Sequence, residues 1–597
     1  MIATSCMLIA APESNAPEIS RIGKEPGMRR QAVNPYLPAG EYIPDAEPYV
    51  FGDRVYIYGS HDRFGAPMFC VNDYVCWSAP VNDLSDWRYE GVIYRRNQDP
   101  RNRLGLRLLF APDVAVGADG RYYLYYAFDF MGMMGVAVAD TPVGPFEFHG
   151  HVHHPDGTLW GRRAGDSFPF DPGVLVDDDG SVYLYSGFHT PVPAIATGCR
   201  RLGFDGGYVL GLESDMMTIR TPERLLFPKS GPGSFPGHEF FEASSIRKWD
   251  GKYYFVYSSR LNHELCYAVS DRPTEGFRYG GTLVSIGDVG LNGHPDETHA
   301  ANYTGNTHGG MLRIGDAFYA FYHRQTNRSS YARQACAEKL DASFDPTAGE
   351  WRFAQSEVTS CGLNGGPLRG DGRYEARIAC NLWSRTGAGR YDGDRPAKRL
   401  AAHPYFTQDG HDGKAGVGPV PACQYIANMR DGAVAGFKYF SPVVGEASDT
   451  GTVPRDGGLQ VACVTVRAHR GFAKADGRFM ISTDPDGVHC IAEIPLHPTN
   501  NDWQVFQSVV MSASIERSEA AGDMGQPDRG TMDGVMTMSA SDVVDTADAS
   551  DTSDTVDAAT AAAPNASDSK HRAVPLYFRY VGTGSIDFLD FTLSAGD

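Results

Sequence analysis

The chain repeats one hairpin pattern five times. Each copy has a short apolar strand, a turn containing glycine and aspartate, and a second strand rich in tyrosine and phenylalanine, which is typical of β-hairpins. Successive copies are separated by roughly 60–70 residues, a regular period that constrains the fold more than any other feature of the sequence. The expected strand pairs lie at residues 49–58, 113–126, 173–185, 245–257 and 310–322.

A regular period made only of strands predicts radial repetition, as in a β-propeller. Each interval has room for a second hairpin, for example residues 135–139 with 146–148. We therefore predict an all-β protein in which residues 31–360 form a five-bladed β-propeller with four strands in each blade. A stacked sandwich is the competing arrangement for these residues, but the nearly equal intervals favour the propeller.

Polar residues stand at the strand that opens each repeat. That strand is the innermost of a propeller blade, so these side chains are expected to converge on the central cavity. Acids that face one another are unfavourable unless they share a proton, a metal or a substrate, which favours a functional site. For Asp171, a structural Asp-Pro turn explains the sequence equally well. The five residues are Asp45, Asp113, Asp171, Glu242 and His308.

Glu242 follows two aromatic residues, Phe240 and Phe241. A carboxyl group surrounded by aromatic rings loses hydration, its pKa rises, and it becomes suited to act as a general acid. A loop glutamate in a structural ion pair is the alternative. Paired carboxyl groups around a pocket are the machinery of glycosidic bond hydrolysis, with a separation of roughly 5 Å for retention and 6.5–9.5 Å for inversion of the anomeric configuration.

These motifs resemble glycoside hydrolase family 43, and the resemblance covers about half of the chain. It implies a five-bladed propeller enzyme that inverts the anomeric configuration. Asp45 resembles the general base, Asp113 the residue that orients the acid and tunes its pKa, and Glu242 the general acid. Ala243 and Ser244 follow Glu242 where many members carry Gly-Pro.

The same resemblance implies further site residues. Arg324 resembles an arginine that reaches the bound sugar, and His61 with Asp62 matches a motif near the pocket. His308 resembles a central histidine close to a calcium ion or to water. A histidine whose hydrogen bonds are satisfied within the core is an equal alternative for His308. No cofactor is expected to be required. Four aromatic residues are candidates for stacking on the sugar, with core packing as the alternative: Trp77, Phe64, Phe130 and Trp160.

The remaining chain divides into three predicted parts. Residues 1–30 are expected to form a disordered leader and residues 361–400 a connecting segment. Residues 401–597 resemble a carbohydrate-binding β-sandwich of the family 6 type. Within it, residues of about 515–570 contain few large apolar side chains and many acids, so they are expected to form a disordered insertion.

Composition limits the classes of partner. A net charge of −20 argues against binding to nucleic acid or to anionic membranes, and no apolar run approaches the roughly 20 residues of a spanning helix. The eleven cysteines include no CxxC pair, so neither a disulfide framework nor a zinc motif is indicated, although Cys70 and Cys76 are a candidate pair. The apolar run 2–11 lacks a basic segment before it, which favours a cytoplasmic location and leaves secretion open.

Together these features predict an inverting exo-glycosidase. Its expected substrates are terminal α-L-arabinofuranosyl or β-xylosyl groups of plant polysaccharides or oligosaccharides. The alternative is a non-catalytic carbohydrate-binding propeller. An interaction propeller of the WD-repeat kind fits less well because acids occupy the repeated positions, and a retaining propeller enzyme acting on fructosides is a further class.

Overall fold

The computed structural model describes most of the two predicted domains. The described residues are 30–129, 131–193, 197, 199–291, 293–390, 401–410, 422–442, 459–508 and 573–595. The predicted leader up to residue 29, Phe130, residues 391–400 of the predicted connecting segment and the predicted acidic insertion lie outside them.

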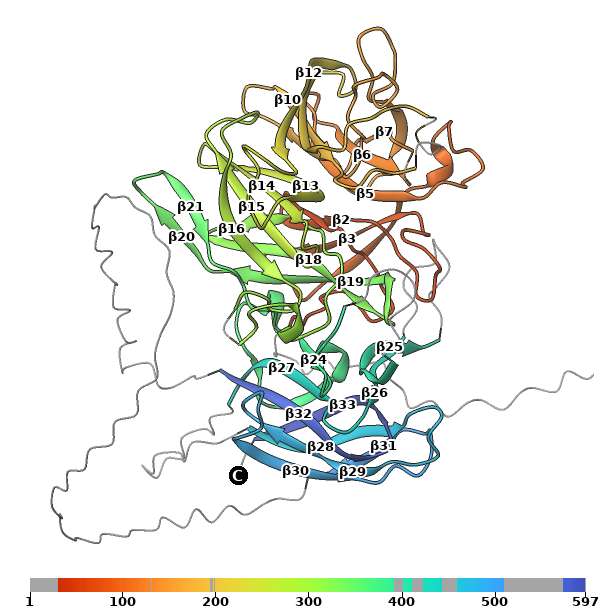
Figure 1. Ribbon diagram of the computed structural model, residues 1–597, viewed down its shortest axis with the longest axis vertical. Helices are drawn as coiled ribbons and strands as arrows, with labels where there is room; N and C mark the ends of the chain where they lie inside the picture. Colours follow the sequence, from red (N-terminus) through yellow and green to blue (C-terminus); the bar gives the residue numbers. More distant parts are fainter. Residues whose placement is uncertain are drawn as a thin grey trace, which may run out of the picture. The chain divides into compact units, whose positions relative to one another are not determined.

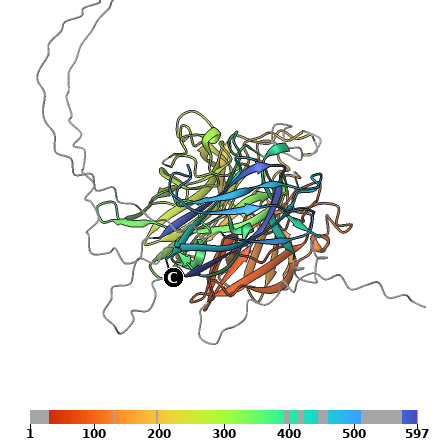
Figure 2. The same ribbon diagram turned by 90° about the horizontal axis from the view of Figure 1, so that it is seen from below.

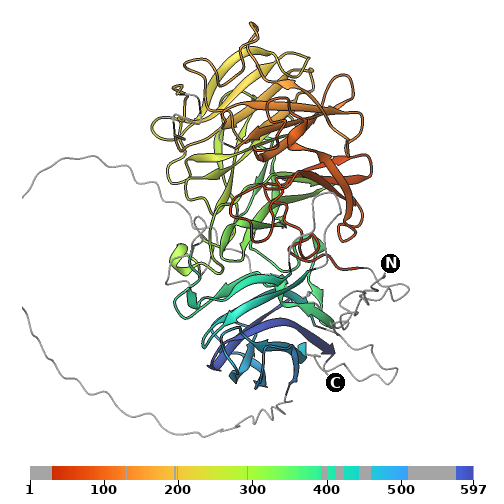
Figure 3. The same cartoon turned by 90° about the vertical axis from the view of Figure 1, so that its right-hand side faces the viewer.

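Five antiparallel sheets follow one another along the chain, as the colours from red to green show in Figures 1 and 3. The first four have four strands each, and they follow chain order within each sheet. The first is β1 (Glu47–Phe51), β2 (Arg54–Tyr58), β3 (Tyr74–Pro80) and β4 (Arg88–Tyr94). The second is β5 (Leu109–Val116), β6 (Tyr122–Phe128), β7 (Met134–Ala139) and β8 (Glu147–His151). The third is β9 (Gly173–Val176), β10 (Val182–Gly187), β11 (Gly206–Leu212) and β12 (Ile219–Pro228). The fourth is β13 (Phe240–Trp249), β14 (Lys252–Ser259), β15 (Glu264–Ser270) and β16 (Arg278–Ser285).

The fifth sheet differs from the prediction of four strands. It consists of β17 (Met311–Ile314), β18 (Ala317–Thr326) and β19 (Ser329–Leu340). After β19 the chain forms a separate hairpin, β20 (Ala342–Asp345) with β21 (Glu350–Phe353). The N-terminal segment lies beside β19 instead, because the backbone N–H of Tyr36 donates to Ala335 O (3.3 Å) and the Asn34 side chain accepts from the N–H of Ala337 (3.1 Å).

The five predicted hairpins correspond to β1–β2, β5–β6, β9–β10, β13–β14 and β17–β18, and the predicted all-β propeller fold is confirmed. Their aromatic second strands are buried: Tyr125, Tyr185 and Tyr257, for example, are fully enclosed. Alternation of side chains across each strand lets both faces of a blade pack against its neighbours. The aromatic repeat is therefore the packing layer between blades.

Two buried side chains join the inner strands of all five blades. Arg247 on β13 donates to Glu47 on β1 (2.7 Å) and to the first carbonyl of β17 (3.1 Å). Asp113 on β5 accepts from the Tyr49 hydroxyl of β1 (2.6 Å) and from the second backbone N–H of β9 (2.6 Å). We call this group of residues, Arg247, Glu47, Asp113 and Tyr49, the central clasp. It shows what Asp113 does in the fold.

The C-terminal domain is a β-sandwich of two six-stranded sheets, coloured green to blue in Figure 2. One sheet contains β22 (Leu368–Arg369), β24 (Asn381–Trp383), β27 (Val434–Ser441), β29 (Asp476–Ser482), β30 (Cys490–Leu496) and β32 (Val574–Thr583). The other contains β23 (Gly372–Glu375), β25 (Tyr405–Asp409), β26 (Cys423–Met429), β28 (Leu459–Ala468), β31 (Gln504–Gln507) and β33 (Ile586–Ala595). Buried phenylalanines, such as Phe437 and Phe591 with ring centroids 4.8 Å apart, fill the space between the sheets.

Part of the predicted connecting segment belongs to this sandwich. β22 and β24 pair with β27, and β23 pairs with β33, so residues 368–383 supply strands rather than a plain connection. Their short strands, of two to four residues, carry no clear alternation in the sequence. The family 6 resemblance of this domain stays a prediction.

Two further sequence expectations concern thiols and membranes. Every cysteine that the structure describes is a free thiol, so Cys70 and Cys76 are not paired. The helices found in the described ranges are short 3-10 turns, η1 (Arg96–Gln98), η3 (Glu297–His299), η4 (Gly362–Asn364) and η5 (Ala376–Ile378), and none of the helices there has the length and apolar character to cross a membrane.

Candidate active site

Three acids and one histidine meet where the inner strands of four blades begin. Asp45 precedes β1, Asp171 precedes β9, His308 precedes β17, and Glu242 lies near the start of β13. His308 Nδ1 lies 3.8 Å from Asp45 Oδ1 and 3.5 Å from Asp171 Oδ2. The Asp171 carboxylate also accepts from the backbone N–H of Ala243 (3.1 Å), which directly follows Glu242.

Backbone strain coincides with this group. Asp45 has φ 58°, Asp171 φ 44° and Ala243 φ 72°, all in the left-handed region that non-glycine residues seldom adopt. Strained backbone of this kind is found at functional sites, where the surrounding structure compensates for its cost. Here it turns the side chains of Asp45 and Asp171 toward the other members of the group.

Asp45 is buried but held in its ionised form. Burial acts to raise its pKa, but the Arg333 guanidinium, 2.9 Å from Asp45 Oδ1, together with His308, His323 and Ser60 outweighs burial and lowers the pKa of Asp45 below its usual value. Arg333 is itself fixed by Asp62, which accepts from its Nε (2.8 Å) and from its second terminal nitrogen (3.0 Å). The bidentate pair is the geometry in which arginine holds a carboxylate most strongly.

Two histidines next to Asp45 are uncharged at neutral pH. Burial lowers the pKa of His308 to about 4 and that of His323 to about 3. His323 Nδ1 lies 3.4 Å from Asp45 Oδ1. At neutral pH, where both rings are uncharged, Arg333 is the cation that contacts Asp45.

Glu242 has the opposite protonation behaviour. Burial, helped by the negative charge of Asp45, raises the pKa of Glu242 to about 8, so this carboxyl group carries its proton at neutral pH. Burial and then the neighbouring Glu242 raise the pKa of Asp171 well above its usual value. Asp45 and Asp171 are only 4% and 3% exposed, whereas Glu242 is partly exposed. Glu242 is therefore the acid that a bound molecule can reach.

The predicted assignment of Asp113 is not supported by this geometry. Asp113 is fully buried in the central clasp. Its carboxylate accepts hydrogen bonds from the Tyr49 hydroxyl and from the backbone N–H groups of Val114 and Val174. Burial raises its pKa to about 6. The residue beside Glu242 is Asp171, which the sequence placed on an equal footing with a structural turn.

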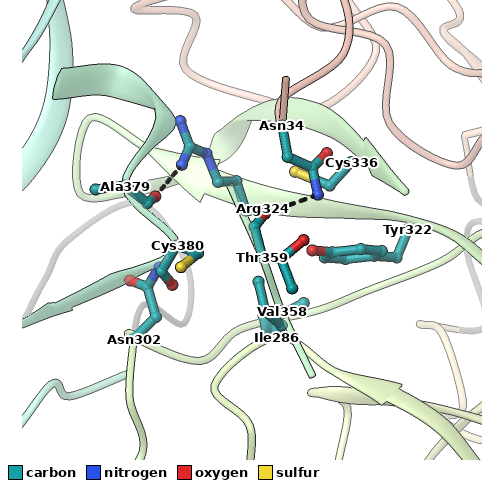
Figure 4. Close-up of a pocket in the computed structure, with 10 residues that line it drawn as sticks. All are labelled: Asn34, Ile286, Asn302, Tyr322, Arg324, Cys336, Val358, Thr359, Ala379 and Cys380. Carbon is teal, nitrogen blue, oxygen red and sulfur yellow. Dashed lines mark hydrogen bonds between the residues drawn. The ribbon is translucent and has the colours of Figure 1, made fainter. Parts of the chain in front are cut away.

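Arg324 also lies elsewhere than predicted. Successive side chains of a strand point to opposite faces, so when His323 faces Asp45, Arg324 faces away. Its guanidinium donates to Ala379 O (2.9 Å) and Arg377 O (2.6 Å) and covers the ring of Phe406 at 3.8 Å. Arg324 is one of the residues drawn in Figure 4, which line a small cavity. The volume of this cavity is about 10 Å³, enough for roughly one water molecule. The arginine at the site is Arg333, nine residues further along the same hairpin.

Most of the other predicted binding residues hydrogen-bond to neighbouring protein groups and lie in the interior of the propeller. His61 contacts Glu41 Oε1 (3.1 Å) and Asp73 O (2.9 Å), and Asp62 is fully buried against Arg333. Trp77 is 3% exposed, lies in the core of the first blade and donates to Glu41 Oε2 (2.9 Å).

Of the further aromatic candidates, Trp160 is 1% exposed and donates to Glu223 (3.0 Å). Phe64 is partly exposed and packs near Tyr42.

Sequence reasoning did not identify Arg333, Phe69 or Phe110 at the site, whereas it did place Phe241 beside Glu242. Phe69 lies under the Arg333 guanidinium at 4.7 Å, and Phe110 packs against Phe170, next to Asp171, at 5.6 Å. These three rings and Phe241 are partly or fully buried. Phe170 and Phe241 directly precede Asp171 and Glu242, so an aromatic residue followed by an acid was the signal in the sequence.

The calcium prediction rests on His308 alone. Calcium takes six to eight oxygen ligands, whereas His308 offers a ring nitrogen whose Nδ1 faces the two acids. In the described part of the chain, no three ligand atoms from His, Cys, Asp and Glu converge at His308. The described residues around His308 therefore do not form a protein-ligated calcium site.

An ionised carboxylate and a protonated carboxylic acid in one group of residues, such as Asp45 and Glu242, are the two groups that hydrolysis of a glycosidic bond requires. The fold and the site together define a glycoside hydrolase, a class of enzyme that acts on carbohydrate.

Comparison with known proteins identifies the family. The family model "Glycosyl hydrolases family 43" matches residues 34–347, and the chain belongs to this family. A xylosidase/arabinosidase from Thermoclostridium stercorarium is 49% identical over 416 residues, which cover 69% of this chain and 84% of that protein. Xylosidase/arabinosidase 43A from Humicola insolens is 34% identical over 283 residues, covering 41% and 80%. The predicted family is confirmed.

Solved structures include a family 43 β-xylosidase/α-arabinofuranosidase from a compost microbial metagenome, in complex with xylotriose and described as a calcium-free form. It is 25% identical and covers 55% of this chain and 98% of that chain, with a TM-score of 0.42.

Proposed function

We propose that this chain is an inverting exo-glycosidase that removes terminal α-L-arabinofuranosyl or β-xylosyl groups from plant polysaccharides or oligosaccharides. The observation that supports it is the opposite protonation of Asp45 and Glu242 within one group of residues. The choice of pentose follows the names of the similar proteins, xylosidase/arabinosidase in both cases.

In this proposal Glu242 is the general acid. It carries a proton at neutral pH and retains exposure, so it can deliver that proton to the oxygen of the leaving group. Asp45, kept ionised by Arg333, accepts a proton from a water molecule that attacks the anomeric carbon from the opposite side. The products are a free pentose of inverted configuration and a shortened saccharide.

Asp171 takes the role that the sequence assigned to Asp113. Its carboxylate is bound to the N–H of Ala243, and it interacts electrostatically with Glu242. Burial and the charge of Asp45 raise the pKa of Glu242, whereas the pKa of Asp171 is itself raised by burial and by Glu242. We propose that Asp171 orients the backbone of the acid through the N–H of Ala243.

The test uses a panel of nitrophenyl pentosides and hexosides with the purified full chain. Release from an α-L-arabinofuranoside or β-xyloside is expected, and NMR of the first-formed sugar should show inversion. Glu242→Gln and Asp45→Asn should each lower turnover by about 10²–10⁴-fold, the usual contribution of general acid–base catalysis. Full activity in both variants would exclude the proposed mechanism.

A matched pair of variants separates the two aspartates. Asp171→Asn should lower kcat/KM, because the backbone N–H of Ala243, next to Glu242, loses its carboxylate acceptor. Asp113→Asn should keep kcat/KM near the wild-type value and instead destabilise the propeller through the central clasp. A loss of kcat/KM in Asp113→Asn alone would restore the original assignment.

A further inference from the structure

Three metal-ligand atoms converge in the fourth blade, in a group distinct from the active site. His238 Nδ1, Glu264 Oε1 and Cys266 Sγ all lie within 4.8 Å of one another. Among the residues that the structure describes, no other group of three His, Cys, Asp or Glu side chains does so. His238 lies 26 residues before Glu264, and a single residue separates Glu264 from Cys266. The sequence therefore contains no CxxC-like motif at this group.

The fold explains why these side chains meet. Glu264 and Cys266 stand two residues apart on β15 and therefore point to the same face of the strand. His238 lies in the turn before β13, where its backbone carbonyl accepts from the Tyr257 hydroxyl (2.7 Å) and its ring stacks on Tyr279 at 4.9 Å. Glu264 and Cys266 are buried and His238 is partly exposed, so the group is held by the blade and still accessible from solvent.

The thiol is the informative member. Cys266 Sγ lies 3.9 Å from His238 Nδ1 and 3.8 Å from both Tyr279 and Thr282 oxygens, all long contacts for sulfur. It therefore gives up no short hydrogen bond when it binds another partner. Glu264 Oε1 lies 2.7 Å from His238 Nδ1.

Ligands of a tetrahedral zinc ion stand roughly 3.3–3.6 Å apart, as bond lengths of about 2.0–2.3 Å require. The Sγ–Nδ1 distance is close to that range, and the His238–Glu264 pair needs to open by less than about 1 Å. The ring of His238 is at the accessible edge of the group and is the part able to move.

We propose that His238, Glu264 and Cys266 form a site for a divalent transition-metal ion of the zinc class. Nitrogen, carboxylate and thiolate donors are the set that zinc takes, and a set that calcium and magnesium do not favour. Three protein ligands leave a fourth position for water. Since His238 is four residues before Glu242, a bound ion anchors the segment that leads into the general acid.

The experiment measures cobalt and zinc binding to the chelator-treated full chain. Cobalt(II) should give the near-ultraviolet absorption of a cobalt–thiolate bond, and zinc should displace it with one equivalent and raise the melting temperature. Cys266→Ser should abolish the absorption. His238→Asn, at a partly exposed position, should weaken binding by more than the roughly 10–100-fold that loss of an outer-shell partner costs.

Cys76→Ser is the matched control, because Cys76 is also fully buried but lies on β3 of the first blade, where its thiol contacts the carbonyl of Trp77 rather than the proposed metal ligands. It should keep the absorption and the affinity of the wild-type chain. Absence of the cobalt–thiolate band in the wild-type chain, or an unchanged band in both Cys266→Ser and His238→Asn, would show a His238–Glu264 hydrogen bond only and overturn the proposal.

Discussion

Replacing Arg333 by methionine tests the electrostatic core of the site. Arg333 donates to Asp45 and doubly to Asp62, and all three side chains are buried. Removal of one partner of a buried ion pair leaves uncompensated charge and costs about 3–5 kcal/mol of unfolding free energy. Methionine keeps most of the packing volume, so the expected loss comes from charge rather than from a cavity.

The same substitution should change the pH profile. An opposite charge at this distance lowers a carboxyl pKa by about 1–3 units, so in Arg333→Met the pKa of Asp45 rises by a similar amount. A base must be ionised to act, and the acidic limb of kcat/KM should therefore move up by about 1–3 pH units. In the wild-type chain, the lowered pKa of Asp45 stabilises the fold above the pKa of the unfolded chain, and this contribution is lost as the pH falls through the folded value.

Arg324→Met is the control for this measurement. Arg324 lies on the same hairpin, is also buried, and holds backbone carbonyls rather than carboxylates. It should lose stability in denaturant unfolding while the acidic limb keeps its position. If the limb moves in Arg324→Met and stays in Arg333→Met, the placement of the two arginines described above is wrong.

Three further predictions follow from the described contacts. The wild-type chain should lose unfolding free energy as the pH rises from about 4.5, the pKa of Glu242 in the unfolded chain, toward about 8, its pKa in the folded chain, by at most about 1.4 kcal/mol per pH unit. Glu242→Gln removes this titration, so thermal melts across the same range should show the variant becoming more stable relative to the wild-type chain as the pH rises. Asp113→Asn should lower the unfolding free energy by about 1–3 kcal/mol, because one N–H or hydroxyl of the central clasp loses its acceptor; an unchanged denaturation midpoint would contradict this. Gln424→Leu should cost a similar about 1–3 kcal/mol, since Gln424 accepts from Gln334 (2.9 Å), next to Arg333, and donates to Tyr42 (2.9 Å); Gln504→Leu, at a strand residue outside this network, is the comparison.

The sequence predicted the propeller because its signal is local and repeated. Each hairpin carries its turn residues and its aromatic strand within about fifteen residues, so five independent copies indicate the same unit. The strands of residues 368–383 were not predicted because they pair with β27 and β33, far along the chain, and have little pattern of their own. Arg333 was missed for a similar reason: its partners Asp45 and Asp62 are more than 250 residues away.

Asp113 and Asp171 show what a motif leaves undetermined. Both acids stand at the start of an inner strand, and both were expected to face the central cavity. Asp113, however, is already inside β5, paired opposite Tyr125, so its side chain is directed by the regular strand toward Tyr49 and β9. Asp171 lies before β9 with φ 44°, and this left-handed turn directs its carboxylate to Ala243 and His308. The structural acid therefore lies within a regular strand, and the acid of the active site lies in a left-handed turn before one. The kcat/KM values of Asp113→Asn and Asp171→Asn measure the consequence of this difference.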